Sequence, residues 1–288
     1  MDFTSTGLIA QVKRRAAIPI SQNLYTESDI ISILNEELQN RIVPWITSLR
    51  EDYFLEEVEY DTGESINEFE IPRSSIGGKI KSVSVWNNDK MSYPLVKTDE
   101  NTLFDSRSGY RIENNKVKLY ITKITSGKIK ISYYKRPNEI VNYTEAGLIT
   151  SVGTGVVTVA TMPAEILNGS DIDISCGKTP FEVNFSGQAS VGINTYSISD
   201  TSGISAGDYV SIKGKSIFAQ IPQEVIPLLC QAATLRMMEY SGDYNAFQAA
   251  LATYQQMESD SRNLLVPKVE FPPKKILGRL KLSRWLWT

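Results

Sequence analysis

Apolar residues recur every three or four positions in two parts of the chain, and this spacing predicts amphipathic helices. The first pattern covers about residues 28–50. Its apolar positions are Ile30, Ile33, Leu34, Leu38, Ile42, Trp45 and Leu49. One stripe of this kind must be buried against another element, so we expect the helix to form part of a larger helical core.

The ends of this first helix carry their own signals. Thr26 and Asp29 have the spacing of a capping box at its start. Pro44 should kink or interrupt the helix, because proline has no N–H and its ring clashes with the preceding turn. The preceding residues 1–26 contain Pro19 and a polar run, so we expect them to be extended or weakly ordered.

The second helical pattern, residues 215–265, predicts a helical hairpin. Gly242 is a candidate C-terminal cap of the first helix and Asp243 a candidate N-cap of the second. A two-residue junction makes the two helices antiparallel. With the helix at 28–50 they should form one core that includes Trp45, Leu229, Leu235, Phe247 and Leu251.

Between the helical patterns the hydrophobic period changes to two, which predicts β-strands. Residues 57–146 alternate apolar and polar positions around turn sequences, and Asn114–Asn115 marks a β-hairpin. We expect an antiparallel sheet with one face in water. The acidic run "REDYFLEEVEYD" is interpreted as solvated charge at the junction of helix and strand, although paired carboxylates of a glycosidase type are the alternative.

A second β block follows at residues 147–214. Its short strands are separated by Gly, Pro and Asn at intervals typical of a small sandwich or barrel of roughly 65 residues. Turn residues at both ends predict a module whose ends lie close together. We expect that a short Gly/Ser linker can replace it and leave the helical body folded.

The predicted fold is therefore α+β: a helical core made by an N-terminal helix and a C-terminal helical hairpin, an antiparallel β region, a small inserted β module and an extended C-terminal arm. The predicted divisions of the chain are residues 1–56, 57–146, 147–214, 215–265 and 266–288.

Composition removes several classes of chemistry. Apolar content of 41% and charged content of 22% are ordinary for a globular protein. The chain has no histidine, so the commonest general base and transition-metal ligand is missing. Cys176 and Cys230 are interpreted as two buried thiols. With no phosphate-binding or catalytic motif in the sequence, we expect no enzyme activity, no cofactor, no bound metal and no membrane insertion.

Two smaller features each allow more than one interpretation. Asp171 and Asp173 are spaced as if to chelate calcium, but the simpler interpretation is a strand with a polar face. Lys13, Arg14 and Arg15 are candidates for contact with nucleic-acid phosphates or with protein. Three basic residues alone do not decide between these partners.

The C-terminal segment is the least ordinary part of the sequence. From Leu264 to Thr288 the chain has six basic residues and one acidic residue, a net charge of +5. Since the whole chain carries −3, the rest must sum to −8. Pro267, Pro272 and Pro273 favour an extended geometry. An acidic body with a basic tail predicts a tail that meets another molecule or a neighbouring copy.

The tail is also unusually apolar for a segment without a core of its own. Flexible exposed segments are poor in Trp, Ile and Leu. We therefore predict a docking arm, with alternation from Leu280 to Leu282 suggesting a short strand that adds to the sheet edge of a partner. A solubilising basic end is the alternative. The predicted docking residues are Lys274, Lys275, Ile276, Leu277, Arg279, Leu280, Lys281, Leu282, Arg284, Trp285, Leu286 and Trp287.

This order of elements resembles that of the head–tail connector proteins of tailed bacteriophages, also called portal adaptor or neck-ring proteins. The resemblance lies in the helix "ILNEELQNRIVPWI", the β phrases "FEIPRSSIGGKIKSV" and "ISYYKRPNEIV", the inserted β module and the hairpin helix "PLLCQAATLRMMEYSGD". It spans nearly the whole chain as a similarity of layout. The inserted module is larger than the simplest helical adaptors carry.

The resemblance implies a structural protein of the virion neck, made in the host cytoplasm. Copies of the chain would form a ring, with twelve subunits expected, between the portal and the tail. The arm would dock on the portal protein or on a neighbouring copy, and a tail or second neck-ring protein would follow below. DNA would pass through the channel without specific binding.

A second hypothesis comes from a different class of protein. The inserted β module is then a carbohydrate-binding or host-attachment unit, in which Phe181, Tyr196 and Tyr209 stack on sugar rings. It predicts a monomer or trimer with affinity for glycans, and it leaves the C-terminal segment unexplained.

Overall fold

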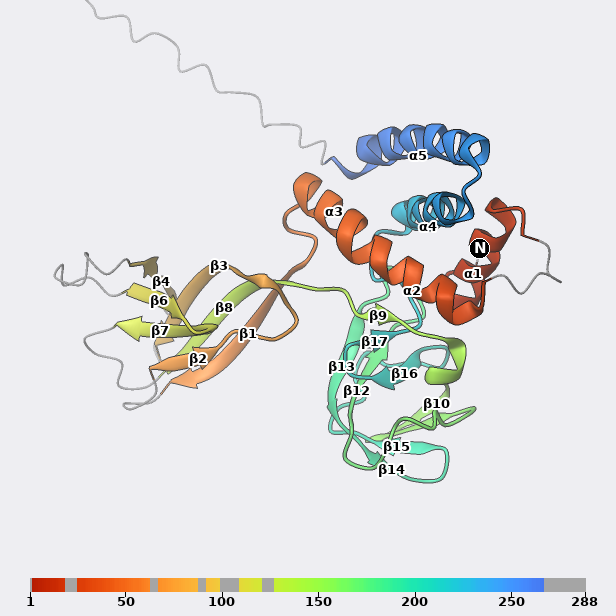
Figure 1. Ribbon diagram of the computed structural model, residues 1–288. Coiled ribbons are helices and arrows are strands. Elements are labelled where there is room, and N and C mark those ends of the chain that lie inside the picture. Colours follow the sequence, from red (N-terminus) through yellow and green to blue (C-terminus); the bar gives the residue numbers. More distant parts are fainter. Residues whose placement is uncertain are drawn as a thin grey trace, which may run out of the picture.

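The fold is α+β, as predicted, and has three parts (Figure 1). A group of helices forms one part, a β lobe (residues 55–135) projects from it to one side, and a second β unit, the module (residues 147–212), lies below the helices. A computed structural model describes residues 2–18, 25–62, 67–87, 92–98, 109–120 and 127–266.

The helical body combines elements from both ends of the chain around one apolar core. Its buried side chains come from every helix, so residues far apart in the sequence share a single interior. The helices are α1 (Ser5–Arg15), α2 (Glu27–Glu37), the π-helical turn η1 (Leu38–Ile42), α3 (Val43–Leu49), the short 3₁₀ turn η4 (Gln223–Val225), α4 (Ile226–Ser241) and α5 (Tyr244–Leu265).

The capping box and the interruption predicted for the first helix are both confirmed. The Thr26 hydroxyl accepts a hydrogen bond from the Asp29 N–H, and the Asp29 carboxylate accepts one from the Thr26 N–H. Ahead of Pro44 the helix widens into the π turn, where the Val43 N–H donates to the Leu38 carbonyl. A proline cannot donate to the preceding turn, and the wider turn accommodates its ring.

The prediction that residues 1–26 are extended or weakly ordered is wrong for α1. Thr4 caps this helix by accepting a hydrogen bond from the Gly7 N–H. Leu8 and Val12 are completely buried, and α1 packs on α2 and α4. A three-turn helix has little stability alone. The stability of α1 comes from packing against residues more than 200 positions further along the chain, and the local sequence pattern does not show this.

The C-terminal helical hairpin is confirmed in detail. Gly242 ends α4 in the left-handed conformation with φ of 72°, and the Asp243 carboxylate accepts from the Ala246 N–H at the start of α5. The expected shared core also forms, since Leu229 and Leu235 are buried while Trp45, Phe247 and Leu251 pack against the same cluster.

The lobe contains two four-stranded sheets, so the prediction of a single sheet is wrong. One sheet has the order β1-β8-β3-β4 and the other β2-β7-β6-β5. Their apolar faces share one core. The strands are β1 (Leu55–Thr62), β2 (Glu68–Glu70), β3 (Ser75–Asn87), β4 (Ser92–Pro94), β5 (Val96–Lys97), β6 (Gly109–Glu113), β7 (Lys116–Tyr120) and β8 (Gly127–Lys135).

The β-hairpin predicted at Asn114–Asn115 is confirmed in the lobe. Asn114 and Asn115 have φ of 49° and 60° and connect β6 to β7 as a two-residue hairpin turn. β1 and β2 come from opposite sheets, and the rings of Tyr60 and Phe69 lie 5.7 Å apart between them. The two sheets bury their apolar faces against each other, and strands that follow one another in the sequence, such as β1 and β2, belong to different sheets.

The module is a seven-stranded sheet that bends around its own core. β10 lies at the centre of the strand order β13-β12-β16-β10-β11-β15-β14 and has an irregular register between Ile149 and Ser151. The strands are β10 (Gly147–Gly153), β11 (Val156–Val159), β12 (Asp171–Ser175), β13 (Val183–Gln188), β14 (Ser190–Val191), β15 (Thr195–Ser197) and β16 (Tyr209–Ile212).

The chain enters and leaves the module at neighbouring positions. Gly147 at the start of β10 is the partner of Val210 in β16. Just outside the module, β9 (Glu139–Ile140) and β17 (Lys215–Ser216) pair in parallel, and a 3₁₀ turn η3 (Tyr143–Glu145) leads into β10. The ends of the module are thus close together and hydrogen-bonded.

Candidate functional site

The predicted docking residues between Lys274 and Trp287 lie outside the described residues. What the structure shows is the point from which they depart. α5 ends at Leu265, and the flanking Leu264 and Val266 are 69% and 44% exposed. The described chain therefore ends in apolar side chains that face solvent, directly ahead of the apolar tail sequence.

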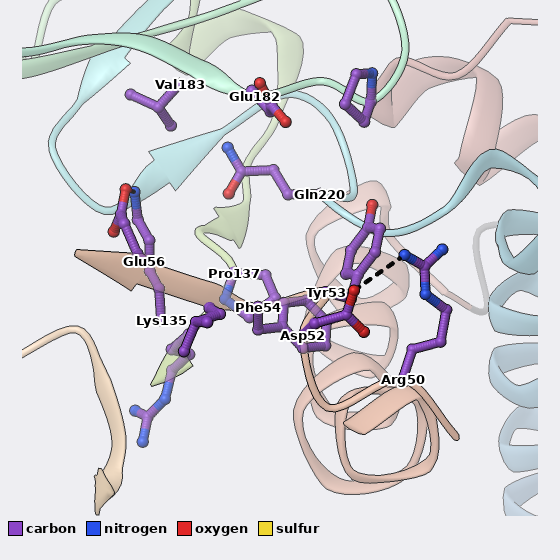
Figure 2. A pocket seen from close by; sticks show the side chains of 13 residues that line it. Arg50, Asp52, Tyr53, Phe54, Glu56, Lys135, Pro137, Glu182, Val183 and Gln220 are labelled. Atoms are coloured by element: carbon purple, nitrogen blue, oxygen red, sulfur yellow. Dashed lines mark hydrogen bonds and ion pairs between the residues drawn. The ribbon is translucent and has the colours of Figure 1, made fainter. Parts of the chain in front are cut away.

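A cleft of about 380 Å³ opens where the three parts of the molecule meet (Figure 2). The segment between α3 and β1 forms one side and the residues after β8 form another. A loop of the module and the segment after β17 complete it. The lining residues are Arg50, Asp52, Tyr53, Phe54, Leu55, Glu56, Lys135, Arg136, Pro137, Pro180, Glu182, Val183 and Gln220.

The charges of this junction cleft are largely matched inside it. Arg50 lies 3.3 Å from the Asp52 carboxylate, and the Lys135 ammonium lies 2.9 Å from that of Glu56. Both pairs are seen among the labelled side chains of Figure 2, the first with its dashed line. A site for a phosphate or a nucleic acid presents an excess of cations. This lining does not.

Tyr53 is the group in the cleft with the clearest pKa shift. Burial raises the pKa of its hydroxyl to about 12, and the nearby Glu182 carboxylate adds to the effect. The phenol therefore stays protonated at neutral pH and acts as a hydrogen-bonding group, since a proton-accepting role would require a pKa near 7. The arrangement is suited to holding three parts of a protein together or to receiving a polypeptide.

The described part of the chain offers little support for a nucleophilic site or a metal site. Burial raises the pKa of the Cys230 thiol to about 12, so this thiol is protonated and unreactive. Cys176 is only half-buried, which corrects the interpretation of two buried thiols. Among the described residues, no three His, Cys, Asp or Glu side chains are grouped to hold a metal ion.

The lobe is attached to the helical body through Glu51, which follows α3. Its carboxylate accepts a hydrogen bond from the Tyr134 hydroxyl of β8 and lies 3.2 Å from the Lys81 ammonium and 3.9 Å from that of Lys79. The Tyr134 hydrogen bond, followed by that from Lys81, lowers the pKa of the Glu51 carboxyl. The sequence predicts solvated charge at this junction, and Glu51 is exposed there, but no local pattern indicates its partners on β3 and β8.

The module is attached through a buried polar network. The Asp173 carboxylate on β12 is 4% exposed. It accepts hydrogen bonds from the Asn138 side-chain amide at 2.8 Å and from the Gly214 N–H at 2.9 Å. The prediction of a strand with a polar face is confirmed by β12, but only Asp171 faces solvent, because Asn138 and the backbone at Gly214 cover the Asp173 carboxylate.

An aromatic cluster joins the module to the helical body as well. Phe181 is 2% exposed and stacks on Phe218, with ring centroids 4.7 Å apart. Phe3, ahead of α1, lies 5.7 Å from Phe181, and Tyr209 lies 5.4 Å from Phe218. These rings belong to the core of the helical body, so the module contributes directly to that core.

The same burial corrects the carbohydrate hypothesis. Phe181 and Tyr196 are buried, and Tyr209 is half-buried against Phe218 and Tyr143. Phe181 and Tyr196 therefore present no open ring face on which a sugar could stack, and Tyr209 is partly covered. Alternation along a strand does not reveal which face is covered by a neighbouring part of the fold, and that is why the prediction for these rings was wrong.

The basic residues of α1 divide between protein contact and solvent. Arg15 donates to the Gln231 side-chain carbonyl at 2.8 Å, which ties α1 to α4. Lys13 is half-buried, whereas Arg14 is exposed. All three lie in the last turn of α1, where cations offset the partial negative charge of the helix end.

No family model matches this chain, and no curated protein matches it. Within the described residues, every helix is too short or too polar to cross a membrane.

Proposed function

We propose that this chain is a structural protein of the neck of a tailed bacteriophage. Copies of it form a ring between the portal and the tail, and the C-terminal segment (residues 267–288) docks on the portal or on a neighbouring copy. The ring continues the DNA channel without binding DNA specifically. The role is mechanical, with no catalytic step.

The observation that carries this proposal is the division of charge and apolar surface between the body and the C-terminal segment. Residues after α5 are basic and aromatic, whereas the rest of the chain carries −8. α5 delivers this segment from a helix end whose Leu264 and Val266 are already exposed. Attraction between opposite charges favours encounter, and the apolar residues supply the energy of docking once water is excluded.

The outer face of α5 supports contact between copies. From Tyr244 to Met257 the helix contains no Asp, Glu, Lys or Arg. Several of these uncharged side chains nevertheless face solvent, among them Gln248, Ala249, Ala252 and Gln256. An exposed helix face normally carries charge. A small and neutral face is better suited to being covered by another subunit, and interface centres are depleted in charge.

A ring also makes weak individual docking effective. Simultaneous engagement of several arms raises the overall affinity by orders of magnitude without new contacts. The acidic balance of the body is compatible with passing DNA, because a lining of this sign does not retain phosphates.

The test is truncation after Val269, measured by co-sedimentation with portal rings at low and moderate salt. We expect the truncated chain to remain folded, with an unchanged helical circular-dichroism signal, and to lose co-sedimentation. The matched control is Lys178→Gln, which removes one cation elsewhere and should leave co-sedimentation intact. If the truncated chain joins portal rings as well as the full chain, the proposal fails.

A further inference from the structure

Strand β1 leaves one side of its backbone without a strand partner in the described part of the chain. It is eight residues long and pairs with β8 alone, at the edge of the sheet order β1-β8-β3-β4. A strand in this position presents a row of N–H and C=O groups that can pair with one more strand.

The two faces of β1 differ in character. Glu57, Glu59 and Asp61 point to the outer, exposed face. Val58 and Tyr60 point inward and are only half-buried, because they lie at the open margin of the lobe core. An added strand that is basic on one face and apolar on the other would match both faces of β1.

No other described sheet edge combines length with charge in this way. β13 is the next longest edge strand, with six residues from Val183 to Gln188, and it carries no charged side chain. β2, β4, β5 and β14 have only two or three residues each. Charged side chains on an edge discourage pairing with strands of the same charge. An acidic edge therefore selects a basic strand.

The C-terminal sequence has the complementary pattern. Residues 279–283 read Arg-Leu-Lys-Leu-Ser. In a strand, successive side chains point to opposite faces, so Arg279 and Lys281 would share one face while Leu280 and Leu282 share the other.

We propose that residues 276–284 of a second copy of this chain add to the free edge of β1 as an extra strand. Arg279 and Lys281 then face the Glu57 and Glu59 carboxylates, each of which already has a lysine of β8 on its other side. Leu280 and Leu282 cover the half-buried Val58 and Tyr60. This inference rests on the proposed function, because a ring supplies the second copy.

The tail is long enough to reach well beyond the end of its own helix. Arg279 lies thirteen positions after Val266, and an extended chain of that length spans up to about 45 Å. When each copy lends its strand to the next, the contact is head-to-tail, and such contacts form a ring when the rotation between copies closes. If the strand docked on its own chain, it would pair the same free backbone groups of β1 but would not link subunits.

Carbodiimide coupling of the full chain tests the inference, because this reagent joins a carboxylate to a lysine amine only when the two are in contact. Copies with natural and with ¹⁵N isotopes are mixed, coupled alone and in the presence of portal rings, and digested for mass spectrometry. We expect links from Glu57 or Glu59 to Lys281 that pair one isotope with the other. The link from Glu59 to Lys128, 3.3 Å apart within the lobe, is the internal control.

Other results overturn the inference. Links to Lys281 within one isotope only would mean that the strand docks on its own chain. Absence of the Lys281 links while the Glu59–Lys128 link forms would exclude this edge. If light scattering or co-sedimentation still shows assembly in that case, the proposed ring stands and only the docking surface is wrong. Loss of assembly with truncation tests the ring separately.

Charge exchange gives a second, independent readout. Glu57→Lys with Glu59→Lys, or Arg279→Glu with Lys281→Glu, should each weaken association about tenfold at low salt. All four changes together should restore it. Glu68→Lys on β2, which also lies between two lysines, is the matched control and should have no effect. If the fourfold variant does not regain association, the charges of β1 and of the added strand are not in direct contact.

Discussion

The lobe and the module are both β structures inserted between helices, yet they are attached to the body in different ways. Two short segments, 50–54 and 136–138, connect the lobe, and the exposed ion pairs around Glu51, with the half-buried Ile76 of β3, hold it. The module has a paired entrance and exit, the buried Asp173 network and the Phe181 contact. Burial determines how firmly an inserted unit is held, whatever its secondary structure.

For the proposed ring subunit, this difference has a mechanical meaning. A part that shares the core of the body must move with it. A part held by exposed charges can change its orientation when a neighbour or a partner binds, since surface ion pairs contribute little free energy. The junction cleft lies at the point where such a change would occur (Figure 2).

The largest expected effect comes from deleting each unit. Replacing residues 55–135 by a short Gly/Ser linker should leave cooperative unfolding and the helical circular-dichroism signal of the body intact. The same replacement of residues 147–212 should abolish cooperative unfolding, because it removes Phe181 and Tyr209 from the helical core. This reverses the expectation drawn from the sequence.

The outcome of the two deletions is measured by thermal and urea unfolding. Equal tolerance of both deletions would show that Phe181 adds little to the body. Burying an aromatic side chain of this size contributes about 2–3 kcal/mol, so a single Phe181→Ala variant provides a check that leaves the module in place.

Sequence reasoning succeeded where a few neighbouring residues decide the structure. The Thr26–Asp29 capping box, the Asn114–Asn115 turn and the Gly242 cap are all local. Prediction from the sequence failed where contacts between distant residues determine the structure. α1 depends on burial of Leu8 in the shared core and on packing against α4, which no short stretch of sequence shows.

The candidate sites follow the same rule. The junction cleft is assembled from four segments, none of which has a distinctive sequence. The buried state of Asp173 depends on Asn138 and Gly214, which lie 35 and 41 residues away in the sequence. The docking residues could be predicted from composition alone, since an aromatic and basic tail stands out in any context, but they remain a prediction because they lie outside the described residues.

An intermediate effect is expected for Asp173→Ala. The change leaves the Gly214 N–H without its acceptor, whereas Asn138 keeps a bond to the Lys215 carbonyl at 3.2 Å. Loss of hydrogen bonds to a buried charged group should lower the free energy of unfolding by about 2–3 kcal/mol. Urea unfolding measures it.

Asp171→Ala on the same strand is the matched control for Asp173. Asp171 is exposed and lies 3.5 Å from the Lys213 ammonium, so its loss should cost less than about 1 kcal/mol. Equal effects of the two substitutions would mean that the buried network does not hold the module.

The smallest effect on stability, and the most informative for the lobe, concerns Glu51 and pH. The pKa of this carboxyl is lowered from its ordinary value near 4.5 by the Tyr134 and Lys81 hydrogen bonds. A group with a depressed pKa contributes fully above its ordinary pKa and loses its contribution as the pH falls through the lowered value. We therefore expect the orientation of the lobe to be constant from neutral pH down to about 4.5 and to broaden below it. Small-angle scattering measures this. Glu51→Gln should give the broad distribution already at neutral pH, whereas Glu59→Gln, which removes a pair inside the lobe, should behave as the unchanged chain. If Glu51→Gln leaves the distribution narrow at every pH, the lobe is held by other contacts and the contrast with the module disappears.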